Sequence, residues 1–133
     1  MNREEWAYFA GFFDGEGCIS VMYSSKRIMN PAISLRVTQV DRTPLDWIQK
    51  RLGGSVKPNY RSDFEEPIHI WTCSRRLLVM DILRQVYPFL IVKKAQANLA
   101  YQLLQLYGGD SRIEGLIDKL HGLKRKRVKL HTL

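Results

Sequence analysis

The chain has 133 residues, of which 45% are hydrophobic, and its 21 Lys and Arg outnumber 13 Asp and Glu to give a formal net charge of +8. This is enough apolar material for one domain over residues 1–133, and no apolar run approaches the roughly 20 residues of a membrane span. Two cysteines provide neither a disulfide framework nor a zinc site. We therefore expect a soluble, intracellular protein, in a compartment that the sequence leaves open, with no membrane partner.

Positive charge is unevenly spread along the chain. Residues 1–14 hold one base and three acids, whereas residues 17–62 hold eight bases and two acids. From residue 113 onward there are six bases, mostly in "KRKRVK", and two acids. This distribution favours one basic face, as nucleic-acid-binding proteins have, over a uniform halo of charge.

The first half of the chain predicts a helix followed by a hairpin. Residues 2–15 suit a helix that Asn2 caps and Gly15 ends. "CISVMYSSKR" at 18–27 and "AISLRVTQV" at 32–40 then alternate apolar and polar residues, as half-buried strands do. Joined through "IMNP", they form a hairpin with one apolar face and one polar, basic face.

The second half repeats this pattern and then adds helices. A helix over 41–54, capped by Asp41 or Thr43, precedes strands at 55–61 and 67–73, the first made irregular by Pro58. Helices follow over 74–90, with a break at Pro88, over 92–107 and over about 112–123. This order predicts an α+β fold in which both hairpins share one sheet, with helices on its apolar face and its polar face bare. Such a bare face fits a DNA groove, although it also fits an ordinary polar surface in water.

The stretch "FAGFFDGEG", residues 9–17, carries the most specific pattern: apolar, Ala, Gly, two apolar, Asp, Gly, acid, Gly. It resembles the signature of the LAGLIDADG homing endonucleases, which stands at the end of a first helix before an αββαββα order. The resemblance extends to about Tyr107, and the single copy resembles the branch that works as homodimers. It implies the αββαββα homing-endonuclease fold, with a saddle-shaped antiparallel sheet and, here, extra C-terminal helices.

The resemblance also implies roles for the motif residues. Glu16 falls on the acid that binds Mg²⁺ (or Mn²⁺), with the carbonyl of Gly15 as a further ligand, whereas Asp14 is open between a helix cap and a ligand. Ala7 and Gly11 lie four residues apart, with Ala10 adjacent, so a second backbone could approach the helix closely. In the family two such helices pack across a twofold axis, and their acidic ends, here Asp14 included, meet at its base.

Two further positions match the family less directly, and a third departs from it. Gln39 ends the second predicted strand, where the family often places a polar residue that orients water, and Lys93 matches a lysine near the cleavage site. An exposed Gln or a solvated Lys explains both equally simply. The second helix has Thr43 where some relatives have an arginine, and whether Arg42 replaces it is open.

If the bare sheet face meets DNA, the alternation predicts which side chains contact it. Arg36 and Lys57 suit guanine, while Asn30 or Asn59 suits adenine. The fourth strand is ambiguous, because either Ile68, Ile70 and Thr72 or Trp71 could be its core set. The basic tail at about 124–133 would contact phosphates. The predicted DNA-binding residues are Ser20, Met22, Ser24, Lys26, Asn30, Ser34, Arg36, Arg42, Lys57, Asn59, Arg61, His69, Trp71, Lys124, Arg125 and Lys126.

The sequence thus predicts an intron-encoded, homodimeric, metal-dependent endonuclease that hydrolyses double-stranded DNA at a long pseudo-palindromic site. The alternative is a non-cleaving nucleic-acid binder on the same fold, either an intron RNA maturase or a DNA-binding regulator. A basic RNA-binding protein unrelated to nucleases is the third hypothesis. The target sequence cannot be derived, because DNA bending also contributes to specificity.

Overall fold

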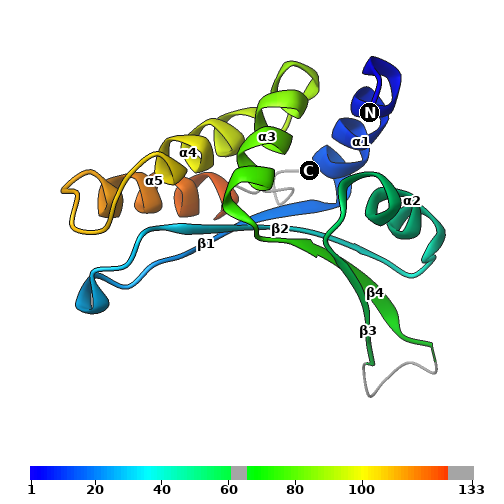
Figure 1. Ribbon diagram of the computed structural model, residues 1–133, viewed down its shortest axis with the longest axis horizontal. Helices are drawn as coiled ribbons and strands as arrows, with labels where there is room; N and C mark the ends of the chain where they lie inside the picture. Colours follow the sequence, from blue (N-terminus) through cyan, green and yellow to red (C-terminus); the bar gives the residue numbers. More distant parts are fainter. Residues whose placement is uncertain (61–65, 126–133) are drawn as a thin grey trace, which may run out of the picture.

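Five α-helices lie over one side of a four-stranded antiparallel sheet in the computed structural model, which describes residues 1–60 and 66–125 (Figure 1). The elements in chain order are α1 (Arg3–Glu16), β1 (Gly17–Met22), η1 (Ser25–Arg27), β2 (Ala32–Gln39), α2 (Thr43–Leu52), β3 (Ser55–Asn59), β4 (Ile68–Cys73), α3 (Arg76–Val86), η2 (Tyr87–Phe89), α4 (Lys94–Leu104) and α5 (Ile113–Arg125). The predicted α+β class and αββαββα order, with extra C-terminal helices, are confirmed.

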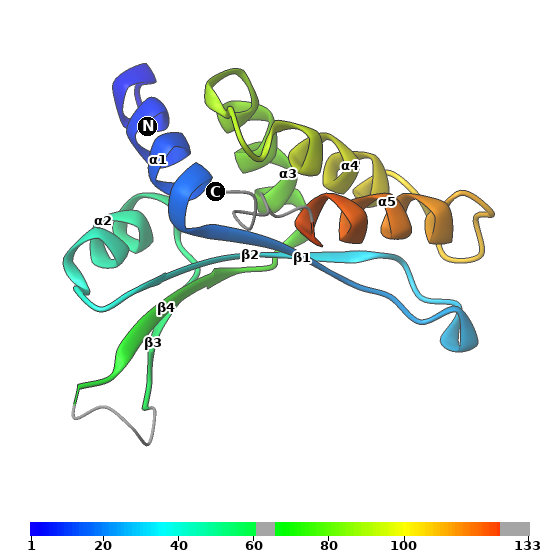
Figure 2. The same cartoon turned by 180° about the vertical axis from the view of Figure 1, so that it is seen from behind.

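The sheet joins both hairpins in the strand order β1-β2-β4-β3. It arches beneath the helices, and Figures 1 and 2 show from both sides that the described helices leave its lower face uncovered. Pro58 lies in β3, opposite His69 of β4. Because β3 is an edge strand, the missing N–H of a proline is tolerated there.

Helix α1 is held by its cap and by its aromatic side chains. Asn2 and Glu5 form a reciprocal capping box, in which each side chain accepts the other's backbone N–H. Trp6, Phe9 and Phe13 are buried, and burying each contributes about 1.5–3 kcal/mol relative to an exposed position. The helix runs to Glu16, so the prediction that Gly15 ends it was wrong.

The last motif glycine has a packing role. Gly17 follows α1 in extended geometry, and a Cβ there would lie 2.3 Å from the Phe13 ring. The chain therefore needs glycine at this position because an aromatic ring occupies the space of a side chain. This close packing fixes where β1 leaves the helix.

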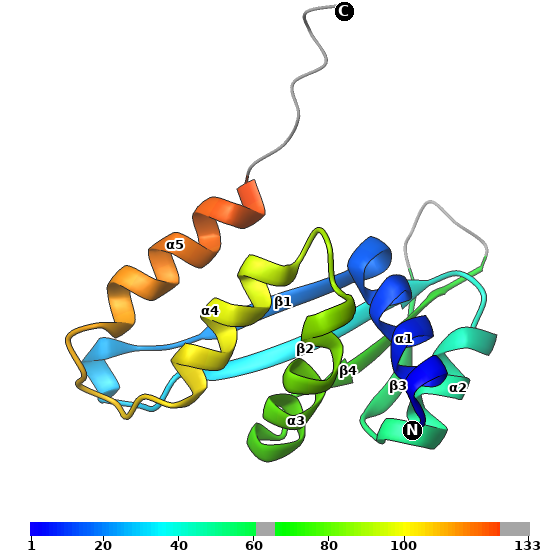
Figure 3. The ribbon, with the colours of Figure 1, turned by 90° about the horizontal axis from the view of Figure 1, so that it is seen from above.

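The other helices cover the same side of the sheet (Figure 3). The N-cap of α2 is Arg42, not Asp41 or Thr43 as predicted, although Asp41 accepts the backbone N–H of Thr43, the first helical residue, at 2.9 Å. Helix α3 ends before Pro88, as predicted, and a single 3₁₀ turn follows it. None of the helices in the described ranges combines the length and apolar character that crossing a lipid bilayer requires.

The first hairpin is shorter than the alternation predicts. Strand β1 ends at Met22, and η1 forms the tip, so Ser24 and Lys26 lie beyond the strand. Ile28 closes η1 with a φ of 45°, a left-handed geometry that β-branched residues rarely adopt. The tip is fastened to the α4–α5 loop, because Asn30 Oδ1 accepts the Gly108 N–H at 2.7 Å.

Candidate nucleic-acid interface and cleavage site

The uncovered face of the sheet presents one set of alternating side chains. Strand register pairs Arg36 with Cys18 and Thr72, and Lys57 with Ile70, so these residues share a face. The opposite face carries the core residues Leu35, Val37 and Trp71. The uncovered face consists of Cys18, Ser20, Met22, Ala32, Ser34, Arg36, Thr38, Ser55, Lys57, Asn59, Ile68, Ile70 and Thr72.

Six of the predicted DNA-contacting residues lie on this face: Ser20, Met22, Ser34, Arg36, Lys57 and Asn59. Arg36, Lys57 and Asn59 are exposed. Among Ser20, Met22 and Ser34 the face is hollowed by about 310 Å³. The face also includes residues that were not predicted as DNA contacts: Cys18, Thr38, Ile70 and Thr72. The alternation of their strands could have indicated that Cys18 and Thr38 lie on it.

On β4, where the sequence left both alternations open, the prediction that Trp71 contacts DNA was wrong. Trp71 is 0% exposed, its Nε1–H donates to the Gly53 carbonyl at 2.8 Å, and its ring meets Phe9 edge to face. An indole gains more from burial with a satisfied N–H than from the solvent side of a sheet. Trp71 therefore lies in the core, and Ile68, Ile70 and Thr72 take the uncovered face.

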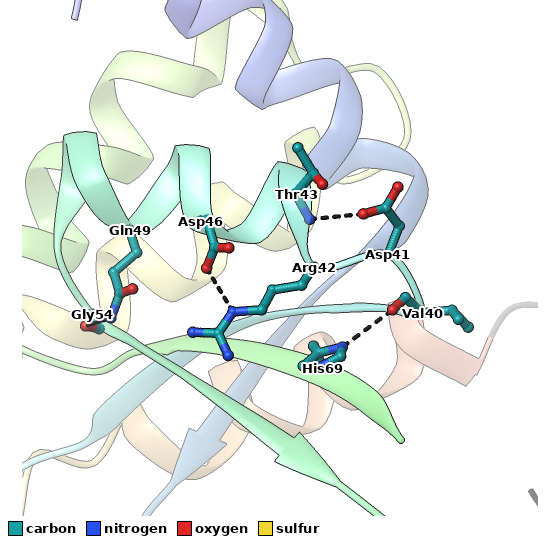
Figure 4. A network of polar contacts seen from close by, with 8 residues as sticks. All are labelled: Val40, Asp41, Arg42, Thr43, Asp46, Gln49, Gly54 and His69. Carbon is teal, nitrogen blue, oxygen red and sulfur yellow. Dashed lines mark hydrogen bonds and ion pairs between the residues drawn. The ribbon is translucent and has the colours of Figure 1, made fainter. Parts of the chain in front are cut away.

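Two of the predicted DNA contacts, His69 and Asn30, have partners within the chain. His69 shares the core side of β4, and its Nδ1–H donates to the Val40 carbonyl at 3.1 Å (Figure 4). The prediction that His69 shares the bare face of the sheet is therefore wrong. Asn30 holds the hairpin tip through Gly108 but is exposed, so its contact with DNA stays a prediction.

Arg42 lies at the start of α2, beside Thr43. Its Nε donates to Asp46 Oδ1 at 2.9 Å, along the exposed side of the helix (Figure 4). An exposed i,i+4 pair of this kind contributes only about 0.3–0.5 kcal/mol. The guanidinium can thus leave Asp46 at little cost.

The motif places one exposed carboxylate at the end of α1. Glu16 is the last residue of the helix, and both Glu16 and Gly15 are exposed. A Cβ on Gly15 would meet no atom within 4 Å outside its own helix backbone and chain neighbours, so there is open space beside this residue. Carboxylate and backbone carbonyl oxygens are hard donors, the kind that Mg²⁺ prefers, so the pair fits such an ion in donor chemistry.

One chain alone does not supply a complete set of metal-binding side chains. Within residues 1–60 and 66–125, no three His, Cys, Asp or Glu side chains come together.

Asp14 joins the end of α1 to the start of α4. Its Oδ2 accepts the N–H groups of Ile91 at 2.9 Å and Val92 at 3.0 Å, and its Oδ1 accepts that of Lys93 at 2.8 Å. In return Lys93 Nζ donates to the Asp14 carbonyl at 2.7 Å. We call these four hydrogen bonds the Asp14–Lys93 clamp.

The clamp changes the acidity of Asp14 and the place of Lys93. Burial would raise the pKa of Asp14, but the N–H groups of Val92, Lys93 and Ile91 together outweigh it and lower the pKa. The Lys93 ammonium is held against the Asp14 carbonyl at the C-terminal end of α1. Gly15 and Glu16 follow Asp14 directly in the chain. Asp14 thus caps a neighbouring segment of its own chain, and its place in a dimer interface stays a prediction.

Gln39 lies near the C-terminal end of α1, where Glu16 and Lys93 also lie. Gly17 pairs with Val37 in the antiparallel register, so β2 continues for two residues alongside the end of α1. Gln39 is its last residue and is half-buried. The structure thus brings Gln39, Glu16 and Lys93 to the region where α1 meets the sheet.

One face of α1 is left open. Gly11 is exposed, and a Cβ there would meet nothing within 4 Å, while Ala7 lies one turn earlier on the same side. Tyr8, Ile91 and Val92 beside it are exposed by 51%, 85% and 71%. Ala10 is 0% exposed in the core, so the prediction that it lines an open seam was wrong.

Two predicted phosphate contacts are helical. Lys124 and Arg125 form the last turn of α5, which therefore extends further than predicted and shortens the tail. Arg61 and Lys126 lie outside the described residues.

Known proteins resemble the chain in sequence. No family model matches it. DNA endonuclease I-CreI of Chlamydomonas reinhardtii is 29% identical over 108 residues, which cover 78% of this chain. The alignment covers 64% of I-CreI, so the chain spans less than two thirds of that relative.

Known structures resemble it in fold. The homing endonuclease I-CvuI, solved in complex with its target in the presence of 2 mM Ca, matches with a TM-score of 0.72 and 26% identity over 96% of this chain and 86% of that chain. The archaeal intron-encoded homing endonuclease I-Vdi141I, solved with DNA, matches with a TM-score of 0.71 and 20% identity over 96% and 88%.

The fold is therefore that of the homing endonucleases. The chain is similar in sequence to DNA endonuclease I-CreI and in fold to solved homing endonucleases, in agreement with the resemblance of residues 9–17 to the LAGLIDADG motif.

Proposed function

We propose that two copies of this chain form a site-specific endonuclease that hydrolyses both strands of a long, pseudo-palindromic DNA site. The observation that carries this proposal is the motif helix. It combines an open face of small residues with one exposed carboxylate at its end.

The uncovered sheet face is the proposed DNA surface. Arg36 and Lys57 are exposed on it, and η1 adds Lys26 and Arg27 at the hairpin tip. A curved two-hairpin sheet suits the major groove, where Arg and Lys recognise guanine N7 and O6. The net charge of +8 per chain supports binding to phosphates, to which Lys124 and Arg125 contribute.

The open face of α1 is the proposed dimer contact. Gly11 and Ala7 allow two backbones to approach, and Tyr8, Ile91 and Val92 supply exposed apolar surface around them. A second copy of α1 covers this surface and places the two Glu16 side chains near one axis. This chain covers 86% of the I-CvuI chain and 88% of the I-Vdi141I chain, so each of those DNA-bound neighbours is a chain of about the same size.

Glu16 and the Gly15 carbonyl would hold Mg²⁺ or Mn²⁺. When bound beside a scissile phosphate, such an ion activates water and stabilises the developing charge. Lys93, fixed by the clamp, would offset phosphate charge, and Gln39 would orient water. Arg42 is the candidate for the arginine that Thr43 does not provide.

The test is Glu16→Gln, which keeps the shape of the side chain and removes its charge. We expect at least a 100-fold loss of Mg²⁺-dependent cleavage of a selected duplex, as for removal of a group that stabilises the transition state, with binding retained. Glu114→Gln on α5 is the matched control and should cut normally.

Undiminished cleavage by Glu16→Gln would overturn the metal assignment. If the unchanged chain binds the duplex specifically but cleaves it with no divalent ion tested, the proposal that it is an endonuclease is overturned. It would favour the alternative of a non-cleaving regulator or RNA maturase.

A further inference from the structure

Two isoleucines interrupt the polar surface that faces the proposed DNA. Ile68 and Ile70 are half-buried on the uncovered side of β4, whereas Trp71 and Cys73 fill the core. In the described part of the chain, the partly buried apolar side chains that pack on the core include Val21 and Val56 but neither isoleucine. Their burial therefore comes from neighbours on the uncovered face.

Those neighbours are polar groups suited to bases. Ile70 pairs with Thr38 of β2 on one side and with Lys57 of β3 on the other, and Ile68 pairs with Asn59. Directly opposite residues have Cβ atoms about 4.5–5.5 Å apart. Thr38, Ile70 and Lys57 thus form one row across three strands, with a hydroxyl, an alkyl group and an ammonium.

The next row repeats the arrangement without the alkyl group. Arg36 pairs with Thr72, two residues along the strands. Two residues of strand advance by about 6.8 Å, which is the rise of about two base pairs at 3.4 Å each. Neighbouring rows therefore face different base pairs. The row that contains Ile70 faces a base pair that the Arg36 row does not contact.

We propose that Ile70, assisted by Ile68, recognises the 5-methyl group of thymine in the major groove. Among the four bases thymine alone presents a methyl group there, and apolar side chains recognise it by contact. The proposal rests on the proposed function and adds one specificity-determining residue for each half of the site. Lys57 and Asn59 beside the isoleucines then read the adjacent base edges.

The first experiment leaves the protein unchanged. A bound duplex is selected from a random library in Ca²⁺, and each thymine in it is replaced singly by deoxyuridine, which lacks only the methyl group. We expect about a fourfold loss of affinity at one thymine, or at two adjacent ones, in each half-site. The remaining thymines should tolerate the change.

A variant then assigns the effect to Ile70. Ile70→Ala should bind the thymine and deoxyuridine duplexes equally at that position. Leu77→Ala is the matched control, because Leu77 is 79% exposed on α3 in the helical layer, and it should keep the difference. Ile70→Val preserves the β-branched shape and should keep part of the difference, which guards against a misfolded alanine variant.

The outcomes separate the two proposals. Specific binding that no single deoxyuridine weakens, or a selected site without thymine, would overturn the role of Ile70 and leave the endonuclease intact. A difference that persists in Ile70→Ala would also overturn it. Failure to select any site would overturn the proposed function, and this inference with it.

Discussion

Asp14 shows how one carboxylate can organise two distant segments. Its partners at residues 91–93 are 77 to 79 positions away in sequence, and all three are backbone N–H groups. Their identity as N–H donors is independent of the side chains there. The sequence could therefore predict that Asp14 caps something at the helix end, but not what it caps.

We expect Asp14→Ala to destabilise the folded chain by about 1–3 kcal/mol, because it leaves three N–H groups without their acceptor. Urea unfolding of the two proteins measures the difference. Asp81→Ala is the control, since Asp81 has only an exposed pair with Arg84 at 3.4 Å, and its cost should be under about 1 kcal/mol. Equal losses in the two variants would contradict the clamp.

The same contribution has a defined pH dependence. The folded-state pKa of Asp14 lies below its ordinary value of 3.8, so the stabilisation is full above that value. It is lost as the pH falls through the lowered pKa. The stability gap between the unchanged chain and Asp14→Asn should accordingly be constant from pH 5 to 7 and close at lower pH; a gap that widens on acidification would refute the assignment.

For Trp71 and Ile70, the sequence alone could not determine which side of β4 is buried. On β4 both alternations carry apolar residues, so periodicity cannot decide which set is buried. The decision comes from Phe9 of α1 and the Gly53 carbonyl, which together accommodate an indole. Arg36 and Lys57 were predictable because their strands alternate clearly.

At the scale of one element, α1 combines two faces with opposite properties. Phe9, Ala10 and Phe13 are buried, while Gly11 faces open space. The sequence predicted the helix and a face of small residues on it. It could not assign Ala10 to the core, because positions 10 and 11 are only about 100° apart on a helix of 3.6 residues per turn.

Gly11→Leu should therefore separate folding from assembly. The added side chain meets no atom of its own chain, so the monomer should fold at least as well, since glycine in a helix costs about 0.5–1 kcal/mol relative to alanine. It should block the second helix and yield monomers in sedimentation, with cleavage lost.

Gly122→Leu is the control, because Gly122 of α5 also has open space around its Cβ position. This variant should remain a dimer and cut DNA. A dimeric Gly11→Leu would place the contact between subunits elsewhere.

At the scale of the whole molecule, charge and layering act together. The described helices cover one face of the sheet, and the other presents Arg36 and Lys57. Alternation and element order predicted this division into layers. The strand order β1-β2-β4-β3, with β3 at the edge, follows from pairings between distant segments that local patterns do not determine.

Binding should consequently depend steeply on salt. A dimer that neutralises about 6–10 phosphates loses about 10³–10⁵ in affinity between 50 and 200 mM salt. Fluorescence anisotropy with the selected duplex and with a scrambled one measures this. We expect nearly parallel slopes for the two duplexes; a flat response would show that the basic groups do not contact phosphates.

The single Glu16 on each chain has a consequence for dosage. In the two-chain site that we propose, the concentration of dimers rises with the square of chain concentration while dimers are scarce. Small amounts of the protein would then be nearly harmless to a genome, and activity would begin sharply once enough chains accumulate. Splitting the carboxylates between two copies would thus set a threshold that a single-chain enzyme lacks.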